Sequence, residues 1–181
     1  MSKEIPSGIT YQYFYRPLDR VTTGVEYALL AVSSLAILLA MILTTVDVLL
    51  RYGFNSPLGW SFDLISLYLL PAAYYLAFAY AMRAGAHLSV DFFKHLLPKV
   101  VVLKIYPLLL ACASIFFVFV SWLLAEEALR SFLDNEVLFG PIAWLKWPTA
   151  AIIAISLFTF SIRLLLSAYQ KAFLEGNRSW K

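Results

Sequence analysis

Residues 27–46 read YALLAVSSLAILLAMILTTV, which is twenty consecutive positions without a charged side chain. Three comparable runs follow at residues 64–82, 105–125 and 147–162. A helix needs about 20 apolar residues to cross the hydrocarbon core of a bilayer. The sequence therefore predicts an all-α membrane protein with four transmembrane helices. We expect a single membrane domain over residues 1–181, with spans at about 25–48, 63–82, 104–126 and 147–169.

The composition agrees with a membrane protein. Of the 181 residues, 62% are hydrophobic and only 14% are charged, whereas soluble domains carry about 25% charged residues. The net charge of +3 is small and the basic residues stand beside the apolar runs, so we expect no nucleic-acid binding. We expect the first run to be a retained helix, because its apolar stretch exceeds the ~7–15 residues of a signal peptide.

Residues that could carry chemistry are sparse. Cys112 is the only cysteine, so it can form neither an internal disulfide nor a CxxC redox pair, and packing is its expected role. His87 and His95 fall outside the predicted spans, which disfavours haem or metal binding. The sequence has no nucleophile–base arrangement, phosphate-binding glycine loop or paired carboxylate site. It predicts no catalytic, substrate-binding or metal-binding residue, no cofactor and no enzyme activity.

The distribution of lysine and arginine predicts the orientation. Both termini and the loop between the second and third runs carry 11 of these residues, and the opposite side carries 3. Because basic residues favour the cytoplasmic side, we expect both termini in the cytoplasm. Aromatic side chains mark the ends of the runs, where amphipathic rings favour the headgroup layer. The expected interface anchors are Tyr27, Tyr80, Tyr106 and Tyr169 on the cytoplasmic side and Trp122, Trp144 and Trp147 on the outer side.

The predicted spans carry ionisable residues only near their ends. These residues are Asp47, Asp63, Glu126, Glu127 and Arg163. Arg163 lies deepest, and we expect its side chain to extend toward the cytoplasm. Carriers and proton relays usually place ionisable groups or broken helices inside the membrane. The empty spans therefore disfavour a chain that transports a substrate by itself.

Local signals indicate how the spans begin, end and connect. We expect the first helix to begin near Thr22–Thr23, whose hydroxyls can cap it, and to end at Asp47 and Arg51, which stand four apart and can pair. Pro71 should kink the second span and free carbonyls that neighbours must satisfy. Two short amphipathic interfacial helices are predicted, at residues 88–97 on the inner side and 126–137 on the outer side, the latter ended by Gly140-Pro141.

Two segments resemble the small membrane subunit of tripartite ATP-independent periplasmic (TRAP) transporters, the DctQ type. Residues 47–63 read DVLLRYGFNSPLGWSFD and residues 77–93 read AFAYAMRAGAHLSVDFF. The chain departs from the family pattern where Pro71-Ala72-Ala73 stands in place of a frequent Gly-Ala pair, and where Asp63 stands in place of a frequent Glu. The matching residues are Asp47, Arg51, Tyr52, Asn55, Pro57, Trp60 and Asp63 in the first segment and Arg83, His87, Val90 and Asp91 in the second.

The resemblance implies a subunit of the cytoplasmic membrane of a bacterium or archaeon. In this family a periplasmic solute-binding protein delivers an organic acid to a large membrane subunit, which moves it with sodium, and the small subunit braces the large one. The implied partners are therefore the large TRAP membrane subunit, the solute-binding protein and membrane lipids. Arg51, Arg130 and Lys146 are candidate contacts with the binding protein, with membrane anchoring of their segments as an equal alternative. We expect Arg83, His87 and Asp91 to form a structural link between the second span and the inner interfacial helix.

Two alternatives stay open at this point. A self-assembling four-helix channel or independent carrier would present a polar stripe to a pore, and the four runs show no convincing one. An assembly subunit of another membrane complex would carry the same aromatic anchors. Small residues on the first two spans allow close helix approach, either within the chain or to a partner. They are Ser33, Ser34, Ala36, Ala40, Ala73 and Ala77.

Overall fold

The computed structural model describes residues 7–84, 99–138 and 142–170, and the side chains of residues 17–84, 107–138 and 142–170. Four of its helices are long and apolar enough to cross a membrane, which confirms the predicted fold class. These helical segments are Pro17–Gly53, Ser61–Arg83, Pro107–Leu133 and Trp147–Gln170. The predicted interfacial helix at residues 88–97 lies outside the described residues.

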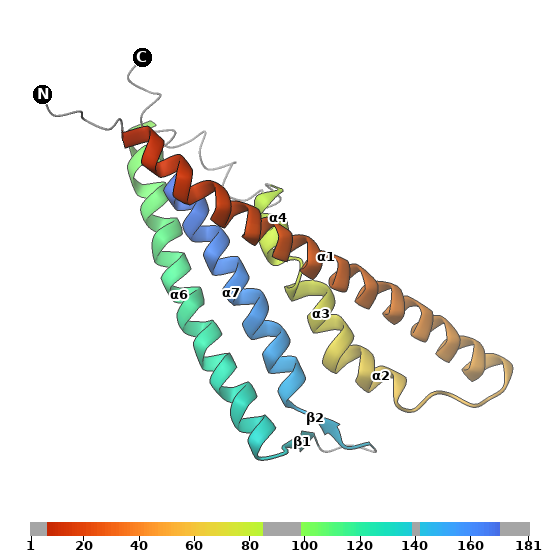
Figure 1. Ribbon diagram of the computed structural model, residues 1–181. Coiled ribbons are helices and arrows are strands. Elements are labelled where there is room, and N and C mark those ends of the chain that lie inside the picture. The colour runs from red at the N-terminus through yellow and green to blue at the C-terminus, as the bar shows by residue number, and fades with distance from the viewer. Residues whose placement is uncertain (1–6, 85–98, 139–141, 171–181) are drawn as a thin grey trace, which may run out of the picture.

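Two of the helices form a close antiparallel pair. Helix α6 (Lys99–Leu133) and helix α7 (Trp147–Gln170) lie side by side along most of their length (Figure 1). Two serines of α6 donate hydrogen bonds across the pair, Ser114 to the Ser161 carbonyl and Ser121 to the Ala154 carbonyl, each at 2.8 Å. Small hydroxyl side chains let the backbones approach, and packing together with interhelical hydrogen bonds drives helix association in lipid.

Helix α1 (Ser7–Gly53) is much longer than the sequence predicts. It begins well before Thr22–Thr23, so the expected start there is wrong. The Thr22 hydroxyl does not cap the helix but donates within it to the Leu18 carbonyl at 2.9 Å, a local bond that lets threonine sit inside a helix. The helix also continues through Pro17.

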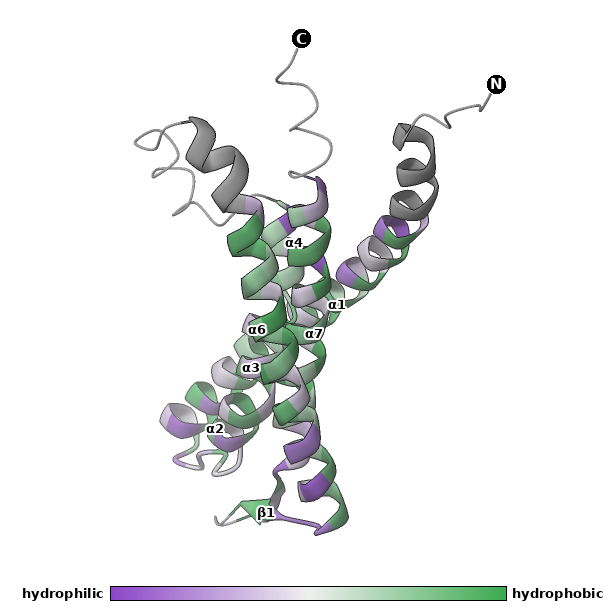
Figure 2. Cartoon of the chain, turned by 90° about the vertical axis from the view of Figure 1, so that its left-hand side faces the viewer, coloured by the Kyte–Doolittle hydropathy of each residue, from purple (hydrophilic) through white to green (hydrophobic). Residues whose placement is uncertain are grey.

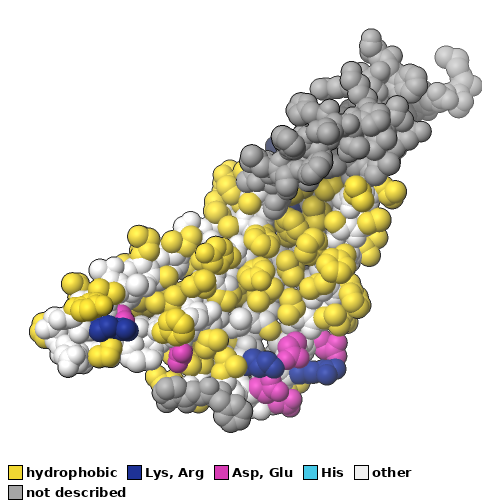
Figure 3. Space-filling view, turned by 180° about the vertical axis from the view of Figure 1, so that it is seen from behind, with side chains coloured by type: hydrophobic (Ala, Val, Ile, Leu, Met, Phe, Trp, Pro, Cys, Tyr) yellow, Lys and Arg dark blue, Asp and Glu magenta, His cyan; other side chains and the backbone are white. Residues whose placement is uncertain are grey.

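Helix α1 crosses the other helices obliquely (Figures 1 and 2). Its middle packs through Ala36 against Ala72 and Leu76 of the second span. Beyond that contact its apolar side chains are open, with Leu35, Met41 and Leu49 56%, 66% and 63% exposed. Hydrophobic side chains cover the middle of the molecule, and charged side chains gather along one edge (Figure 3). The exposed apolar surface suits lipid or a membrane partner.

The second span is interrupted twice. Its parts are α2 (Ser61–Leu64), the π-helical turn η1 (Ile65–Leu69), α3 (Leu70–Tyr75) and α4 (Phe78–Arg83). Pro71 has no N–H to donate, and the hydroxyl of Thr149 on α7 donates at 2.7 Å to the Leu67 carbonyl four residues earlier. At the second break, the Ala73 carbonyl accepts from Ser33 of α1 at 2.6 Å. Both neighbours thereby satisfy carbonyls that the interrupted helix frees.

Helix α6 ends at Leu133, before the predicted end of its outer extension at residue 137. Asn135 adopts the left-handed conformation with φ 48°. The Glu136 N–H then reaches the Ser131 carbonyl at 3.0 Å, and the Asn135 N–H lies 3.4 Å from the Phe132 carbonyl. This is a Schellman termination, whose left-handed position is usually glycine and sometimes asparagine. The chain continues as strand β1 (Val137–Leu138), antiparallel to β2 (Trp144–Leu145).

Candidate functional site

A buried charge cluster joins three of the spans. Arg163 of α7 has a side chain that is 6% exposed, and the Glu26 side chain of α1 is fully buried. Arg163 Nη2 donates to Glu26 Oε2 at 3.2 Å, and Nε lies 2.8 Å from Oε1. Arg163 Nη1 donates at 2.6 Å to Asp19 Oδ1, one of two α1 carboxylates that stand seven residues apart on one helix face. Arg163 therefore points to α1 and is held by two carboxylates of this chain.

Arg83 is the fourth member of this inner charge cluster, which consists of Asp19, Glu26, Arg83 and Arg163. Its Nη1 lies 3.6 Å from Glu26 Oε2, and its side chain is 25% exposed. The guanidinium carbon sits 4.6 Å from the centre of the Tyr27 ring and 5.3 Å from that of Tyr80. Two cations and two carboxylates balance, so the cluster holds α1, α4 and α7 together without an uncompensated buried charge.

The sequence analysis does not single out Glu26, although it directly precedes the charge-free run and lies at the start of the predicted first span. The detectable signal was the seven-residue spacing of Asp19 and Glu26 on a helix that begins earlier than predicted. An arginine seven residues before the end of the last span needs an acidic partner. The two observations together identify the pair.

The first family-like segment builds a tight loop that follows α1. Asp47 Oδ2 accepts from Arg51 Nη2 at 2.8 Å, which confirms the predicted pair, and Oδ1 accepts the Leu58 N–H at 2.7 Å. Asn55 has φ 52°, a left-handed conformation that asparagine tolerates, and lets the chain reverse so that the Phe54 and Ser56 N–H groups share the Leu50 carbonyl, each at 3.1 Å. Asp47 thus fastens the loop to the end of α1.

We expect Asp47→Ala to lower the melting temperature of the purified chain by several degrees, because it removes both the acceptor for the Leu58 N–H and the partner of Arg51. The matched control is Asp63→Ala, which removes a carboxylate in the first turn of α2. Equal melting temperatures for the two variants would show that Asp47 does not hold the loop.

A second charge network lies at the C-terminal end of α6. Lys146 Nζ contacts Glu127 Oε1 at 2.6 Å and Glu136 Oε2 at 3.0 Å. The Lys146 ammonium and the Ser131 hydroxyl lower the pKa of Glu136, and hydrogen bonds to Glu127 and Glu136 raise the pKa of Lys146. Arg130 pairs with Glu126. The three candidate contact cations Arg51, Arg130 and Lys146 are therefore all paired with carboxylates of this chain.

The predicted anchors have different surroundings. Tyr27 lies beside Tyr80 with ring centres 5.7 Å apart, and Trp122 is 71% exposed on α6. Trp144 packs edge-on against Tyr68, whose hydroxyl donates to the Leu145 carbonyl at 2.6 Å. Trp147 packs edge-on against Phe132, and Tyr169 is partly buried on α7. Two residues of the first family-like segment, Pro57 and Trp60, lie in the loop between α1 and α2. The side chain of Tyr106, and all of His87 and Asp91, lie outside the described parts.

Comparison with known proteins gives one informative result. The family model for tripartite ATP-independent periplasmic transporters, DctQ component, matches residues 40–174, which is most of the chain. The match includes both segments that carry the resemblance. Comparisons with curated proteins and with solved structures give no match. Among the residues that the structure describes, no group of three or more potential metal ligands is found.

Proposed function

The chain belongs to the DctQ family and is a small, multi-pass membrane subunit of a TRAP transporter in the bacterial inner membrane, and we propose that it braces the large permease subunit without carrying substrate or sodium. The transporter takes up an organic acid together with sodium, and a periplasmic binding protein delivers that acid. Both termini lie in the cytoplasm, as the lysine and arginine distribution favours.

The interrupted second span carries this proposal. Transporters bind ions where a broken helix leaves carbonyls free near the middle of the membrane. Here the two breaks are closed by hydroxyls of neighbouring helices, Thr149 onto Leu67 and Ser33 onto Ala73. The buried carboxylate of Glu26 is likewise engaged by Arg163. Groups that could serve an ion are thus already used to hold the described helices together.

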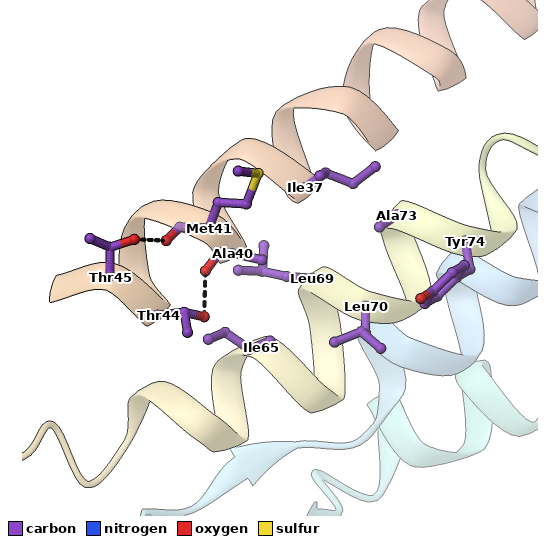
Figure 4. Close-up of a pocket in the computed structure, with 10 residues that line it drawn as sticks. All are labelled: Ile37, Ala40, Met41, Thr44, Thr45, Ile65, Leu69, Leu70, Ala73 and Tyr74. Atoms are coloured by element: carbon purple, nitrogen blue, oxygen red, sulfur yellow. Dashed lines mark hydrogen bonds between the residues drawn. The ribbon is translucent and has the colours of Figure 1, made fainter. Parts of the chain in front are cut away.

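An apolar groove supports the packing of a partner helix. It has a volume of about 560 Å³ and lies between the outer half of α1 and the second span (Figure 4). Ala40 and Ala73 line it, and such small residues allow close helix approach. We propose that a transmembrane helix of the large subunit occupies this groove. Its other lining residues are Ile37, Met41, Thr44, Thr45, Ile65, Leu69, Leu70 and Tyr74.

We propose that the outer side of the molecule contacts the binding protein. The residues proposed for this contact are Arg51, Arg130 and Lys146. Since these cations are paired, a docking protein meets ion pairs and not free cations. Near the C-terminal end of α6, four carboxylates lie close in sequence to Arg130 and Lys146, so this surface carries a net negative charge. They belong to Glu126, Glu127, Asp134 and Glu136.

Copurification tests the bracing function. With an affinity tag on this chain and gentle detergent extraction, the large membrane subunit should elute with it in a fixed ratio. The isolated chain should remain without a conducting pore when it is placed in planar bilayers. Elution as a homo-oligomer that conducts ions would instead support the channel alternative.

A further inference from the structure

One face of α1 beside the inner charge cluster is basic and aromatic. The carboxylates of Asp19 and Glu26 turn toward Arg163. Arg20 and Tyr27, one position further along, share a different face because they also stand seven residues apart. Arg20 is exposed and Tyr27 is 53% exposed. Helix α1 thus separates its inward acidic face from an outward face with a guanidinium and a phenol.

Arg83 completes that outward face. Its guanidinium lies over the rings of Tyr27 and Tyr80. Its anionic neighbour Glu26 is 3.6 Å away, whereas Arg163 approaches the same carboxylate at 2.8 and 3.2 Å. A guanidinium has five N–H donors in a fork that matches phosphate oxygens. Arg83, one quarter exposed, therefore retains donors that can serve an external anion.

This face lies at the end of the second apolar segment, where a span leaves the hydrocarbon core. Arg83 is the last residue of the second apolar segment. The cluster partner Arg163 lies seven residues before the end of α7, which is about 10 Å along the helix axis. Basic residues between helices at this depth bind anionic headgroups, and tyrosine favours the same layer. We propose that this face binds anionic phospholipid headgroups, through Arg83 between Tyr27 and Tyr80 and through the exposed Arg20 about two helical turns along α1.

Native mass spectrometry of the full chain tests this site. Titration with phosphatidylglycerol and, separately, with phosphatidylcholine should show preferential binding of phosphatidylglycerol. Each of Arg20→Gln and Arg83→Gln should weaken that binding by about fivefold, and Arg51→Gln, at the opposite end of α1, should leave it unchanged. Arg20 has no part in the inner charge cluster, so a loss in Arg20→Gln is separable from misfolding.

Two outcomes would overturn the assignment. Unchanged phosphatidylglycerol affinity in Arg20→Gln and Arg83→Gln would remove the two arginines from any lipid site. Displacement of phosphatidylglycerol by inorganic phosphate at a comparable concentration would identify a free phosphate as the ligand. If phosphate does not compete while the arginine variants lose affinity, the lipid assignment stands.

Discussion

Replacing Arg163 with methionine should destabilise the folded chain by about 3–5 kcal/mol, because the substitution removes the closest cation from a buried carboxylate. Glu26 is fully buried, and Arg163 makes its closest contacts. Arg83, whose Nη1 lies 3.6 Å from Glu26 Oε2, offsets only part of this loss because its contact is longer. We expect the melting temperature in detergent to fall on the order of 10 °C, with less protein accumulating in the membrane.

A matched control separates burial from ion pairing as such. Arg130 pairs with Glu126 at an exposed position on α6, with side chains 69% and 46% exposed, and Arg130→Met should cost less than about 1 kcal/mol. The double variant Glu26→Leu, Arg163→Met should recover much of the lost stability, because it removes both buried charges. If Arg163→Met melted at the same temperature as Arg130→Met, the inner charge cluster would not hold the spans together.

Filling the groove between α1 and the second span should disrupt assembly with the large subunit. Leu70 lines the groove and is 42% exposed, away from the contact between Ala36 and Ala72. Leu70→Trp should therefore leave the fold intact but crowd a helix seated in the groove. We expect about tenfold less large subunit to copurify, together with a matching loss of transport by the complete system.

The control for this prediction is a similar enlargement on another apolar face. Leu108 of α6 is 63% exposed and lies outside the groove, so Leu108→Trp should copurify like the unmodified chain. Equal copurification for both variants, at equal melting temperatures, would place the large subunit elsewhere. Loss in Leu108→Trp alone would move the proposed interface to α6.

Local patterns in the sequence predict the features that depend on neighbouring residues, namely the helices and the ion pair of Asp47 with Arg51. The charge-free runs gave the helices, because desolvation of the backbone dominates in lipid. The four-residue spacing of Asp47 and Arg51 gave their pair. Pro71 predicts a carbonyl without its helical donor. No local pattern predicts which group donates to that carbonyl, because Thr149 stands 82 residues away from Leu67.

The remaining features depend on long-range contacts or on single-residue conformations. The pairing of Glu26 with Arg163 joins residues 137 apart, and its acidic member sits just outside an apolar run. Helix α6 ends earlier than the sequence predicts, because Asn135, with its left-handed backbone, stops the helix before Gly140-Pro141. Helix α1 begins earlier than the sequence predicts, because the Thr22 hydroxyl does not cap the helix but donates to the Leu18 carbonyl within it.

Reconstitution into liposomes tests the central claim, that this chain braces a transporter and carries nothing itself. Vesicles containing only this chain should show no uptake of sodium dependent on any carboxylate in a panel of organic acids. Vesicles that also contain the large subunit and receive the binding protein should show such uptake, and it should fall when this chain is omitted. Substrate-dependent sodium uptake by this chain alone would contradict the account.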